Sequence, residues 1–219
     1  MPLTPAPPSY ADHGVFVCFE GGEGSGKSTQ SRRLGAWLGR EGYDVVLTFE
    51  PGDTEVGREV RRIVLSPETG ALDDRTEALL YAADKAEHVA TLVLPALERG
   101  AVVVTDRYVD STLAYQGAGR SLAVAEVEAV ARWATGGLRP HLTVVLDLEP
   151  EAGLGRFAGR DRIEGESLGF HQRVRAAFTA MAAGDPDHYL VLDARADVDT
   201  LERAVRDAVT PLLGQASRP

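Results

Sequence analysis

Residues 15–29 read VFVCFEGGEGSGKST, and this stretch decides the fold. An apolar run at 15–20, which predicts a buried strand, leads into a segment that matches G-x-x-x-x-G-K-[ST] from Gly21 to Ser28. Glycines let backbone N–H groups turn toward phosphate oxygens, and the N-terminus of the following helix adds its positive end. A chance glycine turn is the alternative, but the motif lies between a strand and a helix, as it must. The stretch therefore predicts a loop that binds a nucleoside triphosphate.

The side chains of this loop have distinct expected roles. Lys27 would reach the β and γ phosphates, and the Ser28 hydroxyl would ligate Mg²⁺. The remaining predicted ATP contacts lie in the same segment: Gly21, Gly22, Glu23, Gly24, Ser25, Gly26 and Thr29. The motif alone does not say what is done with the bound nucleotide.

The rest of the chain alternates apolar runs with amphipathic stretches, the pattern of repeated βαβ units. Further strands are expected at 44–49, 101–105, 142–148 and 189–192. Helices are expected at 27–40, 55–65, 73–99, 123–135, 151–158, 168–183 and 198–213, with a kink at Pro95. This order predicts an α/β protein with a three-layer P-loop NTPase fold, in which helices cover both faces of a five-stranded, mostly parallel sheet. Ligands of such sheets bind at the carboxyl ends of the strands.

Composition limits the class of protein. The net charge is −10 with histidine neutral, which argues against a general nucleic-acid binder. Cys18 is the single cysteine, so no intrachain disulfide can form, and a cytoplasmic location is expected. The five histidines have no zinc-ligand spacing, and no apolar run is long enough to span a membrane. We expect a disordered Pro-rich arm at 1–13, one domain at 14–214 and a short tail at 215–219.

Charged side chains follow two of the expected strands. After the third strand, Arg107 could hold an acceptor phosphate, and Asp106 could orient Mg²⁺ or Arg107. A structural ion pair is the alternative. Glu50 follows the second strand, where a simple turn and a role in orienting a substrate or magnesium-bound water are equally supported. In the next helix one of Arg58, Arg61 and Arg62 could clamp a phosphate, although a solvated helix face explains at least two of the three better.

Two further segments carry side chains suited to a pocket. Tyr81 and Lys85 share a helix face, so a base could stack on the ring while the ammonium donates to a base oxygen. Spacing alone nevertheless favours a buried tyrosine beside a lysine whose charge reaches water. Residues 111–117, STLAYQG, combine polar and aromatic side chains without helical amphipathicity, as in the wall of a pocket.

Arginines also cluster around Gly159, between two expected helices. Arg156, Arg160 and Arg162 could belong to a lid at about 157–166 that closes over a transferring phosphoryl group and neutralises its charge. An ordinary charged connection between helices explains the cluster equally well.

Six segments that occur in order resemble bacterial thymidylate kinase, the dTMP kinase of the P-loop nucleoside monophosphate kinase group. They are FEGGEGSGKSTQ, EPGDT, LLYAADKAEH, DRYVDSTLAYQGAGR, LDLEPEAGLGR and DRIEGESLGFHQRVR, and the resemblance runs from about residue 14 to residue 214. It implies transfer of the γ-phosphoryl group of ATP to dTMP, giving dTDP for dTTP synthesis, with Mg²⁺. It also implies a homodimer. Neither nucleic acid nor a membrane is expected as a partner.

The resemblance further implies roles for single residues. Arg61 and Arg107 would hold the dTMP phosphate, Tyr81 would stack on thymine, and Tyr115 would crowd the ribose 2′ position. Glu23 would face the sugar 3′-hydroxyl. The whole predicted dTMP site is Glu23, Glu50, Arg61, Tyr81, Lys85, Arg107, Ser111, Thr112, Tyr115 and Gln116. The predicted catalytic residues are Glu23, Lys27, Arg107, Arg156 and Arg160, and the predicted metal ligands are Ser28 and Asp106.

The sequence departs from the family pattern at several positions. Lys85 and Phe49 stand where arginine is usual, and Asp53 in EPGDT replaces a glycine. Lysine offers a point charge rather than a planar fork, so base preference and acceptor affinity are the properties these changes would affect. Gly24 stands where the eukaryotic-like form has arginine, so the resemblance implies that Arg156 or Arg160 of the lid supplies the missing donor.

Two other functions stay open. One is a P-loop kinase for dUMP or another nucleotide, which the changes at 49 and 85 make worth testing. The other is a non-catalytic nucleotide-binding module, against which the intact Gly26-Lys27-Ser28 and Asp106-Arg107 argue. A GTPase switch is disfavoured because no N-K-x-D segment occurs.

Overall fold

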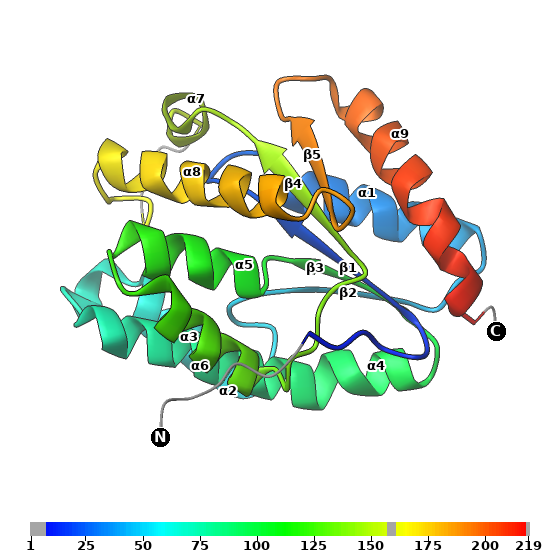
Figure 1. Cartoon of the computed structure of the whole chain (residues 1–219), viewed down its shortest axis with the longest axis horizontal. Helices are drawn as coiled ribbons and strands as arrows, with labels where there is room; N and C mark the ends of the chain where they lie inside the picture. Colours follow the sequence, from blue (N-terminus) through cyan, green and yellow to red (C-terminus); the bar gives the residue numbers. More distant parts are fainter. Residues whose placement is uncertain (1–7, 157–160, 218–219) are drawn as a thin grey trace.

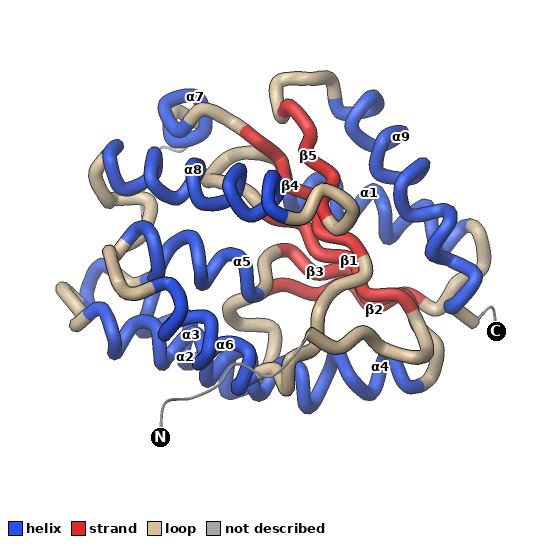
Figure 2. The backbone as a smooth tube through the Cα atoms, viewed as in Figure 1, coloured by secondary structure: helices blue, strands red, loops and turns tan. Residues whose placement is uncertain are grey.

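The computed structural model describes residues 8–156 and 161–217, with a sheet at its centre (Figure 2). All paired strands run parallel, in the order β2-β3-β1-β4-β5. The strands are β1 (Val15–Glu20), β2 (Val45–Phe49), β3 (Val102–Asp106), β4 (Leu142–Asp147) and β5 (Tyr189–Asp193). The predicted parallel α/β sheet is confirmed, and β1, which leads into the P-loop, lies in its middle.

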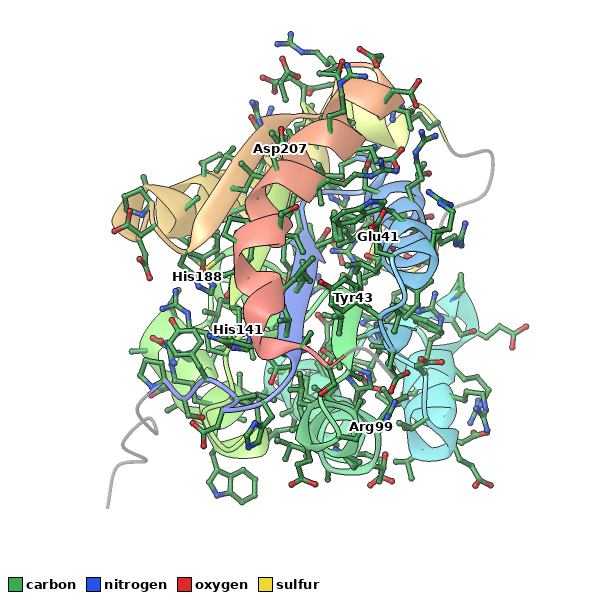
Figure 3. All side chains as sticks on the ribbon, turned by 90° about the vertical axis from the view of Figure 1, so that its right-hand side faces the viewer. Glu41, Tyr43, Arg99, His141, His188 and Asp207 are labelled. Atoms are coloured by element: carbon green, nitrogen blue, oxygen red, sulfur yellow. The ribbon has the colours of Figure 1, made fainter. Side chains whose placement is uncertain are left out.

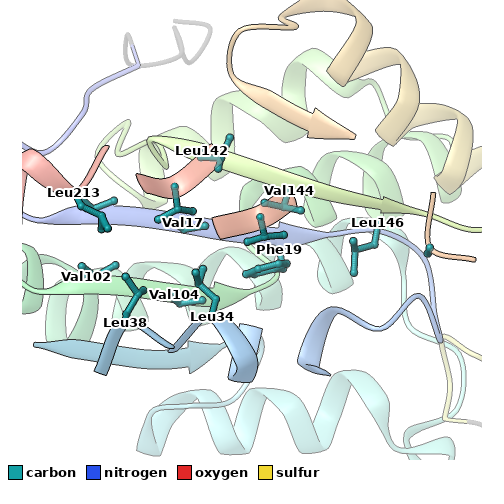
Figure 4. Close-up of a cluster of buried hydrophobic side chains, with 14 of the residues drawn as sticks. Val17, Phe19, Leu34, Leu38, Val102, Val104, Leu142, Val144, Leu146 and Leu213 are labelled. Atoms are coloured by element: carbon teal, nitrogen blue, oxygen red, sulfur yellow. The ribbon is translucent and has the colours of Figure 1, made fainter. Parts of the chain in front are cut away.

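Helices cover both faces of this sheet (Figure 1). On one face, α1 (Lys27–Arg40) buries Leu34 against the strands (Figure 4), and α9 (Val198–Val209) adds Val205 to the same core. On the other face, α4 packs against β3, and α8 packs against β4 and β5. The helices are α1 (Lys27–Arg40), α2 (Glu55–Leu65), α3 (Asp74–His88), α4 (Leu94–Glu98), α5 (Val109–Thr112), α6 (Val124–Ala134), α7 (Pro150–Leu154), α8 (Leu168–Gly184) and α9 (Val198–Val209).

The side chains of β1 alternate between two cores, because successive residues of a strand point to opposite faces of the sheet. Val15, Val17 and Phe19 join the core under α1 and α9, whereas Phe16 and Cys18 join the core under α4. The whole of β1 is buried, as expected for the central strand of a doubly covered parallel sheet. The loop that follows β1 is thereby held at the middle of the carboxyl edge.

The helix predicted over 73–99 is interrupted. α3 ends at His88, a π-helical turn spans Val89–Val93, and α4 begins at Leu94. Pro95 has no N–H to donate to the turn before it, so the hydrogen-bond pattern relaxes directly ahead of the proline. The irregularity expected at Pro95 therefore lies on its N-terminal side.

The segment after β3 is helical, although its sequence predicts only a pocket wall. α5 continues into a π-helical stretch at Leu113–Gly119. Most of these residues are buried, so the segment has no polar face and no amphipathic period from which a helix could be recognised.

The described part of the N-terminal segment is attached to the domain. The Ser9 N–H donates to the Gly137 carbonyl oxygen over 2.9 Å, and the Ser9 carbonyl oxygen accepts from the Arg139 N–H over 2.8 Å. Residues 8–13 of the arm predicted to be disordered therefore include a backbone pairing, and residues 1–7 lie outside the described residues. Across the two described ranges, no helix is long and apolar enough to cross a membrane.

Two histidines near the start of β4 and β5 have structural roles. His141 Nδ1 accepts from the Phe16 N–H over 2.9 Å, and His188 Nε2 lies 3.0 Å from the Thr143 hydroxyl. Burial lowers the pKa of His188 to about 4, so this ring is neutral at pH 7. Both histidines, which are labelled in Figure 3, directly precede their strands and therefore lie at the end of the sheet opposite its carboxyl edge.

Candidate active site

Loops from the carboxyl ends of β1, β2 and β3 meet at one edge of the sheet and surround two adjoining cavities. The larger cavity, of about 870 Å³, has the P-loop in its wall. The smaller, of about 150 Å³, lies among α2, α3 and the segment after β3. The cavities share part of their walls, contributed by Glu23, Glu50, Arg61, Arg107 and Glu164.

The P-loop backbone curls tightly ahead of α1. Gly24 has a φ of 68°, and a side chain there would come within 2.5 Å of a backbone oxygen of α7. Lys27, the first residue of α1, donates to the Gly22 carbonyl oxygen over 2.8 Å, which folds its ammonium over the loop. Burial and the neighbouring Arg107 lower the pKa of Lys27. The loop thus places a lysine and a helix N-terminus on the same side of the larger cavity.

Ser28 and Asp106 come together although 78 residues separate them. The Ser28 hydroxyl donates to the Asp106 carboxylate, where α1 begins and β3 ends. Hydroxyl and carboxylate oxygens are ligands that Mg²⁺ prefers, and both residues line the larger cavity. The two predicted metal ligands therefore fit a magnesium ion beside bound phosphates.

Arg107 lies between the two cavities and makes several polar contacts. Its guanidinium donates to Glu23 Oε1 over 2.6 Å and to Ser111 Oγ over 3.1 Å. The same group lies 5.0 Å from the centroid of the Tyr115 ring. Arg107 has a φ of 73°, a left-handed conformation that costs a non-glycine residue about 1–3 kcal/mol. Backbone strain of this kind is typical of functional sites. No pattern in the sequence predicts the left-handed conformation of Arg107.

Glu23 connects the P-loop with the smaller cavity. Besides Arg107, it accepts from the Tyr115 hydroxyl over 2.8 Å. Burial by itself raises the pKa of the Glu23 carboxyl, but the charges of Arg107 and Lys27 outweigh it and lower this pKa to about 2. Glu23 is therefore a carboxylate at neutral pH, and it orients both Arg107 and Tyr115.

All ten residues predicted to contact the acceptor nucleotide line the smaller cavity. They come from the loops after β1 and β2, from α2 and α3, and from the segment after β3. The sequence prediction missed five further residues of the wall: Pro51, Leu65, Asp161, Ile163 and Glu164. Leu65 and Ile163 are ordinary apolar residues that no motif marks, whereas Asp161 and Glu164 stand within the charged cluster of the predicted lid.

Lys85 pairs with Glu50 at the end of the smaller cavity. Its Nζ lies 2.8 Å from Glu50 Oε2, and His88 Nδ1 lies 2.7 Å from Glu50 Oε1. Burial raises the pKa of Glu50, but Lys85 and His88 outweigh it and hold this pKa below its ordinary value. Lys85 Nζ also lies 6.0 Å from the centroid of the Tyr81 ring. The predicted neighbours Tyr81 and Lys85 therefore share the cavity, and Lys85 is buried rather than solvated.

Phe49 and Asp53, the two positions in this region that depart from the pattern the sequence resembles, each contact a neighbouring side chain. Asp53 accepts from the Thr48 hydroxyl over 2.6 Å. The Arg61 guanidinium lies 5.7 Å from the centroid of the Phe49 ring and donates to the Pro51 carbonyl oxygen over 2.8 Å. Phe49 therefore supports Arg61 by packing instead of adding a second guanidinium.

Glu77 lies behind the smaller cavity, and the sequence prediction did not identify it. It accepts from Gln116 Nε2 over 2.9 Å and from Arg120 Nε over 3.0 Å, and it also accepts from Arg162. Arg162 further donates to the Val64 carbonyl oxygen over 2.8 Å. These contacts attach the segment that follows residue 160 to α2 and α3.

Arg156 and Arg160 are the two lid arginines predicted to be catalytic, and only Arg156 lies within the described residues. The Arg156 guanidinium donates to the Gly24 carbonyl oxygen over 2.5 Å and lines the larger cavity. Arg160 lies outside the described residues, as do residues 157–159 at the start of the predicted lid.

A parallel sheet with a P-loop after its central strand, and a second cavity lined by arginines beside that loop, is the architecture of a P-loop kinase. Proteins of this class hold a nucleoside triphosphate next to an acceptor and transfer a phosphoryl group between them. Known proteins of similar sequence narrow this class to a family.

The family model described as thymidylate kinase matches residues 19–205. The thymidylate kinase of Cutibacterium acnes is 53% identical over 202 residues, which cover 92% of this chain and 99% of that protein. The thymidylate kinase of Clavibacter sepedonicus is 55% identical over 185 residues, which cover 83% of this chain and 87% of that protein. The crystal structure of thymidylate kinase from Ehrlichia chaffeensis matches with a TM-score of 0.73 at 28% identity, covering 90% of this chain and 99% of that one. The chain belongs to the thymidylate kinase family.

Proposed function

We propose that the two adjoining cavities bind ATP and dTMP, and that the chain transfers the γ-phosphoryl group of ATP to dTMP, giving ADP and dTDP. Membership in the thymidylate kinase family supports this reaction, a phosphotransfer in nucleotide biosynthesis. The observation that carries the proposal is the gathering of all ten predicted acceptor residues around one cavity, which shares a wall with the P-loop cavity.

The larger cavity suits the donor nucleotide. Lys27 and the N–H groups of the P-loop would bind the β and γ phosphates. Ser28 and Asp106 would hold Mg²⁺, which when bound neutralises phosphate charge. Arg156, or Arg160 beside it in the chain, would neutralise the charge that develops on the transferring group.

The smaller cavity suits the acceptor nucleotide. Arg61 and Arg107 would hold the dTMP phosphate at the wall shared with the donor cavity. Tyr81 would stack on thymine, and Tyr115 would crowd the ribose 2′ position. Lys85 carries three N–H donors, so donors remain for a base oxygen when one is given to Glu50.

The proposed chemistry is an in-line displacement. A phosphate oxygen of dTMP forms a bond to the γ-phosphorus, and the bond from that phosphorus to the β–γ bridging oxygen breaks, its electron pair leaving with ADP. The acceptor oxygen is already negatively charged, so no protein base has to remove a proton. The residues of the chain act by positioning two anions, neutralising their charge and excluding water.

ADP release tests this proposal when it is measured with Mg²⁺-ATP and, in turn, dTMP, dUMP, dCMP, AMP, GMP or no acceptor. We expect the highest turnover with dTMP and none with the Lys27→Ala variant, which controls for contaminating kinases. A higher turnover with another nucleotide would favour the alternative acceptor. Nucleotide binding without acceptor-dependent turnover would favour a non-catalytic module.

We also propose that the chain is a homodimer and that it acts in the cytoplasm. An apolar groove of about 160 Å³ lies between α3 and α6. Leu79 on α3 lines it and is 58% exposed, and Trp133 near the end of α6 is 72% exposed. The exposure of these apolar side chains supports the proposal that a second copy of the chain covers this part of the surface. A single cysteine and the use of ATP support the cytoplasm.

A further inference from the structure

Glu20, the last residue of β1, is a buried carboxylate that the proposed reaction does not use. Its side chain is fully buried, and it lines neither of the two cavities. The strand that it ends is otherwise apolar. A buried carboxylate is costly, and here burial and the nearby Asp110 raise the pKa of Glu20 to about 7. Stabilisation of the fold therefore does not explain why a carboxylate occupies this position, and another role has to be sought.

Within the described part of the chain, the side-chain hydrogen bonds of Glu20 lead to the segment after β3, apart from a long contact with Cys18 Sγ. Glu20 Oε1 accepts from the Tyr108 N–H over 2.8 Å and from the Ser111 N–H over 3.0 Å. Glu20 Oε2 accepts from the Ser111 hydroxyl over 2.6 Å. A single carboxylate thus fixes the two ends of the short turn that follows Arg107.

The same contacts act on the side chain of Arg107. Because the Ser111 hydroxyl gives its one hydrogen to Glu20, its oxygen is left to accept from Arg107 Nη1, which lies 3.1 Å away. Arg107 directly precedes the Tyr108 N–H that Glu20 holds, and its backbone is in the left-handed conformation. Glu20 therefore restrains both the backbone of Arg107 and the direction of its guanidinium.

We infer that Glu20 is a positioning residue for the acceptor phosphate, which holds Arg107 toward the acceptor cavity through Ser111 and the Tyr108 N–H. The inference rests on the proposed role of Arg107 in binding that phosphate. An amide could accept the two backbone N–H groups at its oxygen, but its NH₂ group would then face the Ser111 hydroxyl. Ser111 would receive hydrogens from two sides and lose the acceptor for its own, so Arg107 would be held less well.

The variant Glu20→Gln separates this role from a purely structural one. We expect the KM for dTMP to rise about tenfold, as for the loss of one charge-assisted hydrogen bond, while the KM for ATP changes less than about twofold. The melting temperature should stay the same or rise at pH 8, because the substitution removes a buried charge. Asp207→Asn, on the outer part of α9 (Figure 3), makes the same chemical change at an exposed position and should alter none of these values.

The variant Ser111→Ala tests the chain of contacts from its other end. It should raise the KM for dTMP by a similar factor, and adding Glu20→Gln to it should have little further effect, because both break the same link. Equal increases in both KM values together with a lower melting temperature would overturn the inference in favour of a structural role. An unchanged KM for dTMP in Glu20→Gln would overturn it as well.

Wild-type turnover in the same experiment reports separately on the proposed function. If the wild type prefers an acceptor other than dTMP, the proposed substrate is wrong, and the comparison of variants is made with the preferred nucleoside monophosphate. Arg107 would face the phosphate of either acceptor. The KM for the preferred acceptor is therefore expected to rise by the same factor in the variants, relative to the wild type.

Discussion

At the residue scale, the buried carboxyl of Glu20 and the partly buried carboxyl of Glu23 have pKa values shifted in opposite directions. Burial and Asp110 raise the pKa of Glu20 to about 7, whereas the charges of Arg107 and Lys27 outweigh burial and lower the pKa of Glu23 to about 2. Glu20 accepts hydrogen bonds from uncharged groups, but Glu23 contacts a guanidinium at 2.6 Å. The sequence could not predict the opposite shifts of these two pKa values, because the direction of the Arg107 side chain depends on an unusual backbone angle that no motif encodes.

The Glu23→Gln variant should change how the protein responds to acid. A carboxyl whose folded pKa lies below its ordinary value of 4.5 stabilises the fold above that pH, and this stabilisation is lost as the pH falls toward 2. We expect the free energy of unfolding in urea to fall less steeply between pH 4.5 and pH 2 in this variant than in the wild type. Parallel curves for the two proteins over that range would contradict the assignment of Glu23 as the partner of Arg107.

At the element scale, the strands and most helices follow directly from the hydrophobic pattern. The prediction of β1 and α1 rests on an apolar run and a P-loop, and both elements have the predicted bounds. The pattern fails where a helix is buried on nearly every side, as at 109–119, since periodicity then carries no signal. It also fails within 73–99, where a π-helical turn accommodates Pro95 without changing the apolar face.

The close approach of α2 and α3 makes a specific prediction at Gly57. A side chain at this position would come within 2.4 Å of Asp84 Oδ1 and 2.9 Å of Thr54 Oγ1. Gly57→Ala should therefore destabilise the protein, although alanine normally stabilises a helix interior by about 1 kcal/mol relative to glycine. Gly35→Ala in α1 is the matched control, because its side chain would only make ordinary contacts at 3.7 Å and 3.8 Å. Chemical denaturation that finds both variants more stable than the wild type would exclude the tight contact.

At the scale of the whole molecule, the parallel sheet explains why so much of the site could be named from the sequence. Strands that run in one direction bring their carboxyl ends to one edge, so residues that follow separate strands meet there. The supporting contacts could not be named in this way. Glu77 holds Gln116, Arg120 and Arg162 from behind the acceptor cavity, and these pairs depend on how helices pack rather than on any local pattern.

The proposed dimer belongs to this scale as well. Leu79→Asp would place a charge in the apolar groove between α3 and α6, so we expect it to shift the protein from dimer to monomer in sedimentation equilibrium at micromolar concentration. Val198→Asp, at an exposed position where α9 begins, should leave the dimer intact. A wild-type protein that sediments as a monomer would contradict the proposal outright.

The central claim is that two adjoining cavities hold donor and acceptor separately, with Arg107 serving the acceptor and Lys27 the donor. Calorimetric titration of Arg107→Ala and Lys27→Ala with each nucleotide tests this claim most directly. We expect Arg107→Ala to weaken dTMP binding about a hundredfold and to leave ATP binding nearly unchanged, and Lys27→Ala to do the reverse. Arg58→Ala, an exposed arginine on α2, should affect neither. Variants that weaken both nucleotides to the same extent, or that leave dTMP binding intact without Arg107, would contradict the account.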